Sequence, residues 1–231
     1  MNGTNKSVLL YSGGMDSFLM NYIVKPDTTL FIRTHTEAND LEYETLLKLQ
    51  EKGIITNNVE VVEYDLSKYE RPEQNYYLPL RNLHFVTLAS HYGDKVFLGS
   101  TGCSVHFDNN EKFSTMCENL ISYLLSETNE GPVKVLLPFR DTSKTDLLKL
   151  YVNLGGDIEI AYNSSLSCYT PKDNKPCMSC VCCASKFTAF YNNGYNFSED
   201  EINKFITYVG DNKEIQKGDV IELYNKLKER S

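Results

Sequence analysis

The sequence lacks several features that would assign it to a particular class of protein. It contains no run of about eighteen apolar residues, so we expect no membrane span. The first residues, MNGTNKSVLLYSGG, lack the charged start, apolar middle and cleavage site of a secretory signal, which predicts a cytoplasmic protein. The formal net charge is -8, and no dense cluster of Lys and Arg is present to attract nucleic acid. We therefore expect neither a membrane nor a nucleic acid as partner.

Cysteine is present in an odd number, seven, which argues against a disulfide framework in a chain without an export signal. Cys168, Cys177, Cys180 and Cys183 are separated by eight, two and two residues. Cys-x-x-Cys turns place two thiolates on one zinc ion, and four thiolates close a tetrahedral site, so this spacing predicts structural Zn²⁺. Cys182 can replace Cys183 as a ligand, although the spacing favours Cys183. An iron–sulfur cluster is the alternative occupant of the same thiolates.

Apolar runs alternate with helical patterns over most of the chain. Buried strands are predicted at residues 6–11 and 28–33, and further strands at residues 59–66, which alternate in polarity, 95–99 and 133–137. This order favours an α/β fold, with a mostly parallel five-stranded sheet and helices on both faces. After residue 161 the chain becomes polar and cysteine-rich, and helical patterns return near residues 200–208 and 220–228. We expect an α/β domain over residues 1–160 and a small zinc-bearing helical extension over residues 161–231.

The segment Ser12–Ser17 (SGGMDS) lies between the first predicted strand and the first predicted helix. Its glycines permit a tight turn, and the positive end of the following helix favours an anion. The hydroxyl groups of Ser12 and Ser17 can donate to phosphate oxygens, whereas Asp16 would act through Mg²⁺ or cap the helix. A plain strand–turn–helix connection, capped by Asp16 or Ser17, explains the same residues. The Gly-Lys-Ser/Thr ending of a Walker loop is missing.

This segment resembles the SGGxDS loop of the N-type ATP pyrophosphatases, which have an adenine nucleotide alpha hydrolase-like fold. The resemblance implies that Ser12, Gly13, Gly14, Asp16 and Ser17 bind the pyrophosphate part of ATP. Together with the C-terminal Ser-Cys-Tyr and Cys-x-x-Cys-x-x-Cys motifs, the loop resembles the 7-cyano-7-deazaguanine synthase family of queuosine biosynthesis.

The family resemblance implies an ATP-dependent carbon–nitrogen ligase. ATP adenylates the carboxylate of 7-carboxy-7-deazaguanine, and ammonia then attacks to give the amide. A second adenylation leads to 7-cyano-7-deazaguanine, with release of AMP and pyrophosphate. The implied cofactors are Mg²⁺ with ATP and structural Zn²⁺, and the family suggests a homodimer.

Four further residues carry the resemblance or are implied by it. Arg81 and Asn82, in the stretch Pro79-x-Arg81-Asn82, are expected to bind substrate, and Asp108 and Lys144 are expected to be catalytic. Arg81 can hold a phosphate or carboxylate through two hydrogen bonds, and Lys144 can neutralise phosphate charge. The plainer interpretations are a solvated arginine, a helix cap at Asn82, a loop carboxylate at Asp108 and a solvated lysine.

Two segments depart from the family pattern. His106–Asn110 stands where the family has Tyr-Pro-Asp-Cys-Arg, so the aspartate is retained and the arginine is not. Thr34–Thr36 stands where the family has Tyr-Gly-Gln. Both segments are expected near the substrate. A divergent member that stops at the amide, or joins another amine to a deazaguanine carboxylate, therefore stays open as an alternative.

Two other functions are open. An adenylating tRNA-modification enzyme that inserts sulfur would need a reactive cysteine pair, and Cys103 and Cys117 are not closely spaced. A non-catalytic zinc-ribbon binding module would not bind ATP. His35 and His106 can act in acid–base chemistry, but lone loop histidines usually do not. Glu42–Glu44 is interpreted as a solvated helix face.

Overall fold

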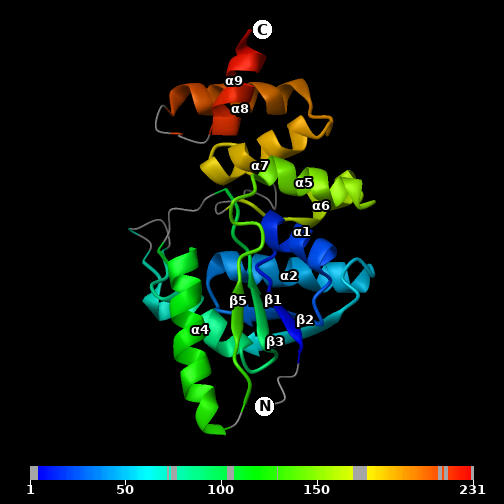
Figure 1. Cartoon of the computed structure of the whole chain (residues 1–231). Coiled ribbons are helices and arrows are strands. Elements are labelled where there is room, and N and C mark those ends of the chain that lie inside the picture. The colour runs from blue at the N-terminus through cyan, green and yellow to red at the C-terminus, as the bar shows by residue number, and fades with distance from the viewer. Residues whose placement is uncertain are drawn as a thin grey trace. The chain divides into compact units, whose positions relative to one another are not determined.

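The chain forms two compact units, Met1–Ser143 and Lys144–Ser231, in the computed structural model (Figure 1). The structure describes residues 5–71, 73, 77–102, 107–128, 130–168, 176–212, 215 and 218–229. Within these residues, no helix combines the length and the apolar character that crossing a membrane requires. The boundary predicted between residues 160 and 161 falls inside α6 (Ile158–Ser164), a helix of the second unit.

The first unit contains a five-stranded sheet in the order β3-β2-β1-β4-β5, and every neighbouring pair is parallel. This confirms the predicted fold class. The strands are β1 (Ser7–Leu10), β2 (Thr28–Arg33), β3 (Asn58–Glu63), β4 (Lys95–Leu98) and β5 (Lys134–Leu136). β1 lies at the centre, where Val8 is opposite Thr28 of β2 and Val96 of β4. Its apolar residues Val8, Leu9 and Leu10 are all buried, as expected for a strand covered on both faces.

Helices cover both faces of this sheet, because side chains alternate between the faces along each strand. They are α1 (Met15–Val24), α2 (Glu37–Glu51), α3 (Arg81–Ala89) and α4 (Glu111–Leu125). On one face, Leu30 and Ile32 of β2 share a core with α3 and α4, which contributes the buried thiol of Cys117. On the other face, the ring of Phe31 lies 5.6 Å from that of Tyr43 in α2.

The order of the strands creates a switch point in the first unit. From β1 the chain proceeds outward through β2 and β3, then crosses to the other side of β1 to form β4 and β5. The connections that leave the carboxyl ends of β1 and β4 therefore diverge, and parallel α/β sheets bind ligands in the crevice that results. The segment that leaves β1 at this point is SGGMDS.

The second unit is built from helices. They are α5 (Lys144–Asn153), α6 (Ile158–Ser164), α7 (Val181–Asn192), α8 (Glu199–Asp211) and α9 (Gly218–Lys228). Phe187 of α7 and Phe205 of α8 stack in its core, with ring centroids 4.5 Å apart. Ser198 and Glu201 form a capping box that begins α8. Sequence patterns predict neither α6 nor α7. α7 is buried from Cys183 to Phe190, so no polar face marks its helical period.

Candidate active site and metal centre

The SGGMDS loop connects the central strand β1 to α1 at the switch point. Gly13 has a φ of 70°, a conformation that glycine adopts more readily than other residues. Gly14 is the N-cap residue of α1, so the N-terminus of this helix is left without a capping side chain. The loop therefore places the positive end of a helix dipole, without a capping side chain, at the switch point, and this suits an anion.

Hydroxyl groups organise this loop. The Oγ atoms of Ser12 and Ser17 lie 3.3 Å apart, and Ser17 Oγ donates to the carbonyl oxygen of Gly14 at 3.0 Å. The backbone N–H of Ser12 donates to Ser17 Oγ at 3.2 Å. Ser17 is thus buried against the loop that it closes, while Ser12 is exposed. The two candidate phosphate ligands are therefore adjacent in space.

Asp16 lies in the first turn of α1 and turns toward the strand on the other side of the switch point. Its Oδ2 accepts a hydrogen bond from Thr101 Oγ1, which follows β4, at 2.9 Å. Asp16 thus joins the two connections that diverge there. A carboxylate at this position can hold Mg²⁺ beside bound phosphates.

Glu42 of α2 packs against the SGGMDS loop from behind. A Cβ atom at Gly13 would lie 3.2 Å from Glu42 Cβ, so the backbone of the loop rests directly on this side chain. Burial raises the pKa of the Glu42 carboxyl to about 7, and the positive charge of Arg81 and a hydrogen bond from Asn39 oppose the shift. The prediction of a solvated face over Glu42–Glu44 therefore fits Glu44, which is exposed, and is wrong for Glu42.

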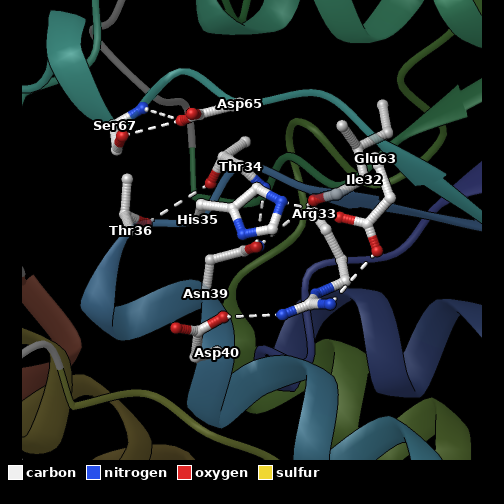
Figure 2. A network of polar contacts seen from close by, with 10 residues as sticks. All are labelled: Ile32, Arg33, Thr34, His35, Thr36, Asn39, Asp40, Glu63, Asp65 and Ser67. Atoms are coloured by element: carbon white, nitrogen blue, oxygen red, sulfur yellow. Dashed lines mark hydrogen bonds and ion pairs between the residues drawn. The ribbon is translucent and has the colours of Figure 1, made fainter.

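A polar network follows the carboxyl ends of β2 and β3 (Figure 2). Its centre is His35, whose φ is 59°, which is unusual for a residue with a side chain. His35 Nε2 lies 2.7 Å from Glu63 Oε2 at the end of β3. Hydrogen bonds from Ser67 lower the pKa of the Asp65 carboxyl below its ordinary value, and His35 contributes to the same shift. The network thus places an imidazole and two carboxyl groups at the ligand-binding edge of the sheet.

Asn39 holds the chain that leaves β2. Its Oδ1 accepts from the backbone N–H of Thr34 at 2.8 Å, and its Nδ2 donates to the carbonyl oxygen of Ile32 at 3.2 Å. The same Nδ2 lies 3.3 Å from Glu42 Oε2. Asn39 is buried, so it connects the His35 turn to the carboxyl group behind Gly13. No sequence motif marks Asn39, because the fold alone brings its hydrogen-bond partners to it.

The structure brings the expected substrate residue Asn82 to Asp108. Asn82 is buried at the start of α3, and its Nδ2 donates to the backbone carbonyl oxygen of Asp108 at 3.0 Å. The N-cap of α3 is Leu80, so Asn82 does not cap this helix. Arg81 is exposed, and its charge acts on Glu42. Of the segments singled out from the sequence, Cys103, His106 and Tyr169 lie outside the described residues.

The four predicted zinc ligands converge in the second unit. The Sγ atoms of Cys168, Cys177, Cys180 and Cys183 all lie within 4.8 Å of one another. Backbone N–H groups donate to three of these sulfur atoms: Cys177 N to Cys168 Sγ, Ser179 N to Cys177 Sγ, and Cys183 N to Cys180 Sγ, at 3.3 to 3.4 Å. Such bonds are typical partners of metal thiolates, so the site suits a tetrahedral ion such as zinc.

The environment favours the thiolate form of Cys180, whereas the hydrogen bond with Cys180 and burial raise the pKa of the Cys183 thiol. Hydrogen bonds from Cys182 and Cys183 lower the pKa of the Cys180 thiol. One turn further along α7, the ammonium of Lys186 is buried and donates to the carbonyl oxygens of Tyr162 and Ser165, at 2.7 and 2.5 Å. Burial lowers the pKa of Lys186 to about 7. Lys186 thus ties the helix that carries Cys183 to the end of α6.

Lys144 is the first residue of α5 and is half-buried. It belongs to the second unit, whereas the SGGMDS loop, Arg81, Asn82 and Asp108 belong to the first. Within the first unit, two groups of expected site residues are each brought together. One is the SGGMDS loop and Arg81, which are linked through Glu42, a residue not expected to be part of the site, and the other is Asn82 with Asp108.

The arrangement matches a known family. A family model described as "Queuosine biosynthesis protein QueC" matches residues 28–194. The chain belongs to the QueC family. This confirms the family to which the sequence motifs point. The QueC match includes Arg81, Asn82, Asp108 and the four cysteines, whereas the SGGMDS loop precedes it.

Curated relatives of this QueC chain carry the name 7-cyano-7-deazaguanine synthase. The enzyme of Leptospira interrogans is 28% identical over 222 residues, which cover 84% of this chain and 89% of that protein. The enzyme of Persephonella marina is 24% identical over 221 residues, covering 82% and 94%. That of Archaeoglobus fulgidus is 25% identical over 215 residues, covering 82% and 87%. The similarity thus extends over both units in bacterial and archaeal proteins.

Proposed function

We propose that this chain is a 7-cyano-7-deazaguanine synthase that uses ATP to convert 7-carboxy-7-deazaguanine and ammonia into the nitrile. The observation that carries the proposal is a loop with an uncapped helix N-terminus at the switch point of a QueC-family α/β unit, which is the kind of position that suits an anion. In this proposal, Ser12, Gly13, Gly14 and Ser17 bind the pyrophosphate part of ATP. Asp16, held by Thr101, binds Mg²⁺ beside it.

The chemistry requires two activations. A carboxylate oxygen attacks the α-phosphorus of ATP, which forms the acyl adenylate and expels pyrophosphate. Ammonia then attacks the acyl carbon, AMP leaves, and a proton is released with the amide. A second ATP adenylates the amide oxygen, and loss of AMP and a proton leaves the nitrile. The protein contributes positioning and charge stabilisation, since the leaving groups come from ATP.

Residues around the loop have separate roles in this proposal. Arg81 binds a phosphate of ATP or the carboxylate of the substrate. It is exposed at the start of α3, and its charge acts on Glu42, which packs against the SGGMDS loop. Asn82 holds the segment that carries Asp108, which contacts the deazaguanine ring. Lys144 neutralises phosphate charge in the adenylation step. His35 belongs to the segment Thr34–Thr36, which departs from the family pattern. In this proposal it lies beside the substrate, at the carboxyl end of β2.

Zinc has a structural role in the proposed enzyme. Cys168, Cys177, Cys180 and Cys183 would hold it, and four thiolates leave no open coordination position for substrate. When bound, the ion supplies folding free energy to the loop that precedes α7. The family also suggests that the enzyme is a homodimer.

The experiment is mass spectrometry of the products formed from Mg-ATP, ammonium and 7-carboxy-7-deazaguanine by the zinc-loaded protein. We expect the nitrile, with two AMP released for each product molecule. 7-Deazaguanine without the carboxylate is the control, and it should give no AMP. The amide alone would support the alternative of a divergent member that stops halfway. Absence of AMP with the carboxylate would overturn the assigned substrate.

A further inference from the structure

The last bond changes of the proposed reaction need a group that accepts a proton. Adenylation of the amide oxygen, with loss of one nitrogen proton to solvent, gives an imidate that keeps a single N–H bond. The nitrile forms when this N–H bond breaks, its electron pair becomes the third C–N bond, and the C–O bond to AMP breaks. Because an imidate N–H is a weak acid, a positioned general base should speed this step. The roles proposed for Arg81, Asp108 and Lys144 do not include accepting this proton.

The fold gives His35 the partner that orients a general base. In the sequence it is a lone loop histidine, but in the structure its Nε2 lies 2.7 Å from Glu63 Oε2 (Figure 2). An ionised carboxyl group only accepts hydrogen bonds, so Nε2 carries the hydrogen and Nδ1 keeps a lone pair when the ring is neutral. Within the described part of the chain, Nδ1 has no hydrogen-bond partner, and the side chain is 40% exposed. This nitrogen can therefore accept a proton from a ligand.

Glu63 is itself held in place. Its Oε1 accepts a hydrogen bond from Arg33 Nη1 at 3.1 Å, and Arg33 Nη2 donates to Asp40 Oδ1 at the same distance. The guanidinium of Arg33 lies 4.5 Å from the ring centroid of Tyr43. Oε2 of Glu63 is thus directed to His35, where a carboxylate both orients the imidazole and stabilises its charged form.

The backbone at His35 has a conformation that a side chain makes unfavourable. Its φ of 59° lies in the left-handed region, which glycine adopts at lower cost. The family pattern Tyr-Gly-Gln has glycine at this place, where this chain has Thr34-His35-Thr36. A hydrogen bond of 2.8 Å from Thr34 N to buried Asn39 holds the turn. Strain of this kind persists mainly at functional sites, so the imidazole is a candidate for a role in the chemistry.

We propose that His35 is the general base of the nitrile-forming step and that Glu63 is the positioning residue that orients it. Nδ1 takes the imidate proton as AMP leaves, and the imidazolium then lies between the carboxylates of Glu63 and Asp65, while Arg33 is paired with Glu63 and Asp40. The exposed ring returns the proton to solvent. This inference rests on the proposed function and assigns one step of it to the carboxyl ends of β2 and β3.

The test starts from the amide of 7-carboxy-7-deazaguanine, so that only the second activation is measured. Amide-dependent exchange of labelled pyrophosphate into ATP reports adenylation, and mass spectrometry reports the nitrile. His35→Gln should keep the exchange rate within about twofold and lose about a hundredfold in nitrile formation, because glutamine cannot take up the proton. Glu63→Gln should lose about tenfold in nitrile formation with exchange unchanged, because the imidazolium loses its counter-charge.

His91→Gln is the matched control, because His91 is exposed between α3 and β4, at the amino end of the sheet. It should keep both rates. An equal loss of exchange and nitrile in His35→Gln would assign the residue a structural role and overturn the inference, as would nitrile formation at the wild-type rate. A wild-type chain that releases no AMP with the carboxylate would instead overturn the proposed function, and this inference with it.

Discussion

The two units of the chain organise their functional residues differently. In the first unit, buried strands such as β1 and β2 form the core, and the polar residues gather where these strands end. In the second unit, α7 carries buried Cys183 of the four-cysteine cluster next to Ala184, which belongs to the aromatic core. A site at the edge of a sheet can therefore be changed without loss of the fold, whereas a metal ion held by the four cysteines would contribute to the folding of the second unit itself.

The largest effect should come from removal of zinc. Cys180→Ser takes one ligand from the cluster, and zinc binding to four-cysteine sites contributes on the order of 10 kcal/mol to folding. We expect loss of zinc by elemental analysis and loss of amide-exchange protection in α7, α8 and α9. The sheet of the first unit should keep its protection.

Cys182→Ser is the matched control for the metal centre. Cys182 neighbours the cluster but does not belong to the four converging thiols. The variant should therefore keep its zinc and its protection pattern. Equal zinc loss in both variants would show that Cys182 is a ligand, and unchanged protection in Cys180→Ser would show that the metal does not stabilise the second unit.

The next effect separates activity from stability in the first unit. Gly13→Ala introduces strain at a φ of 70° and a Cβ atom 3.2 Å from Glu42 Cβ, so the SGGMDS loop must shift. We expect a loss of AMP release of about a hundredfold, since misplaced N–H donors stabilise phosphate charge poorly. The free energy of unfolding should fall by only about 1–2 kcal/mol.

Gly53→Ala is the control for backbone strain at Gly13. Gly53 also has a positive φ, 65°, but a Cβ atom there would meet nothing within 4 Å. Denaturant titration should show a similar stability loss for both variants, and AMP release should fall only for Gly13→Ala. A similar loss of activity in both would mean that the position of Gly13 in the loop has no special role.

Sequence patterns predict the five strands and the cysteine cluster, because each of these features depends on residues that are close together in the chain. Local patterns predict β1 to β5 within a few residues: β1 and β2 are apolar runs because they are covered on both faces, whereas the edge strand β3 alternates in polarity and has no fully buried residue. Zinc ligation likewise constrains cysteine spacing directly, and the four predicted thiols converge. α7 is missed because a helix buried on all sides has no polar face, and its cysteines favour an irregular interpretation.

Sequence patterns do not reveal contacts between segments that are distant in the chain. Glu42 lies in a helix segment with Asp40 and Glu44, and the approach of Gly13, from a different connection of the sheet, covers its side chain. The same holds for Asn82, whose partner at Asp108 lies 26 residues away. Predicted site residues such as Ser12 and Ser17 come from a motif, whereas the side chains that position the motif come from the fold.

The Glu42 carboxyl group behind the SGGMDS loop should make the free energy of unfolding depend on pH. The pKa of Glu42 is raised to about 7 in the folded state, above the ordinary value of 4.5 that we expect in the unfolded chain. The folded state then binds more protons between these values, so the contribution of Glu42 to stability falls as pH rises from 4.5 to 7. Between pH 5.5 and 8 the loss is about 2 kcal/mol.

Glu42→Gln should remove this pH dependence, because the amide keeps the shape of the side chain and does not ionise. The measurement is denaturant unfolding at pH 5.5 and pH 8, and the difference between the two values is compared with that of Glu44→Gln. Glu44 is exposed in the same helix, so its variant should behave as the wild type does. Equal pH dependence in all three proteins would contradict the burial of the Glu42 charge.

The smallest predicted effect concerns the backbone of His35 at the carboxyl end of β2. His35 has a φ of 59°, and its Nε2 lies 2.7 Å from Glu63 Oε2 (Figure 2). His35→Ala and His35→Gly both remove the pair with Glu63, but only alanine keeps the strain of the left-handed conformation. Gly should therefore be more stable than Ala by about 1 kcal/mol in denaturant titration, although glycine is the more flexible residue in the unfolded chain. The reverse order would mean that the turn does not require a left-handed residue, and the sheet edge of the first unit would then carry its polar network without backbone strain.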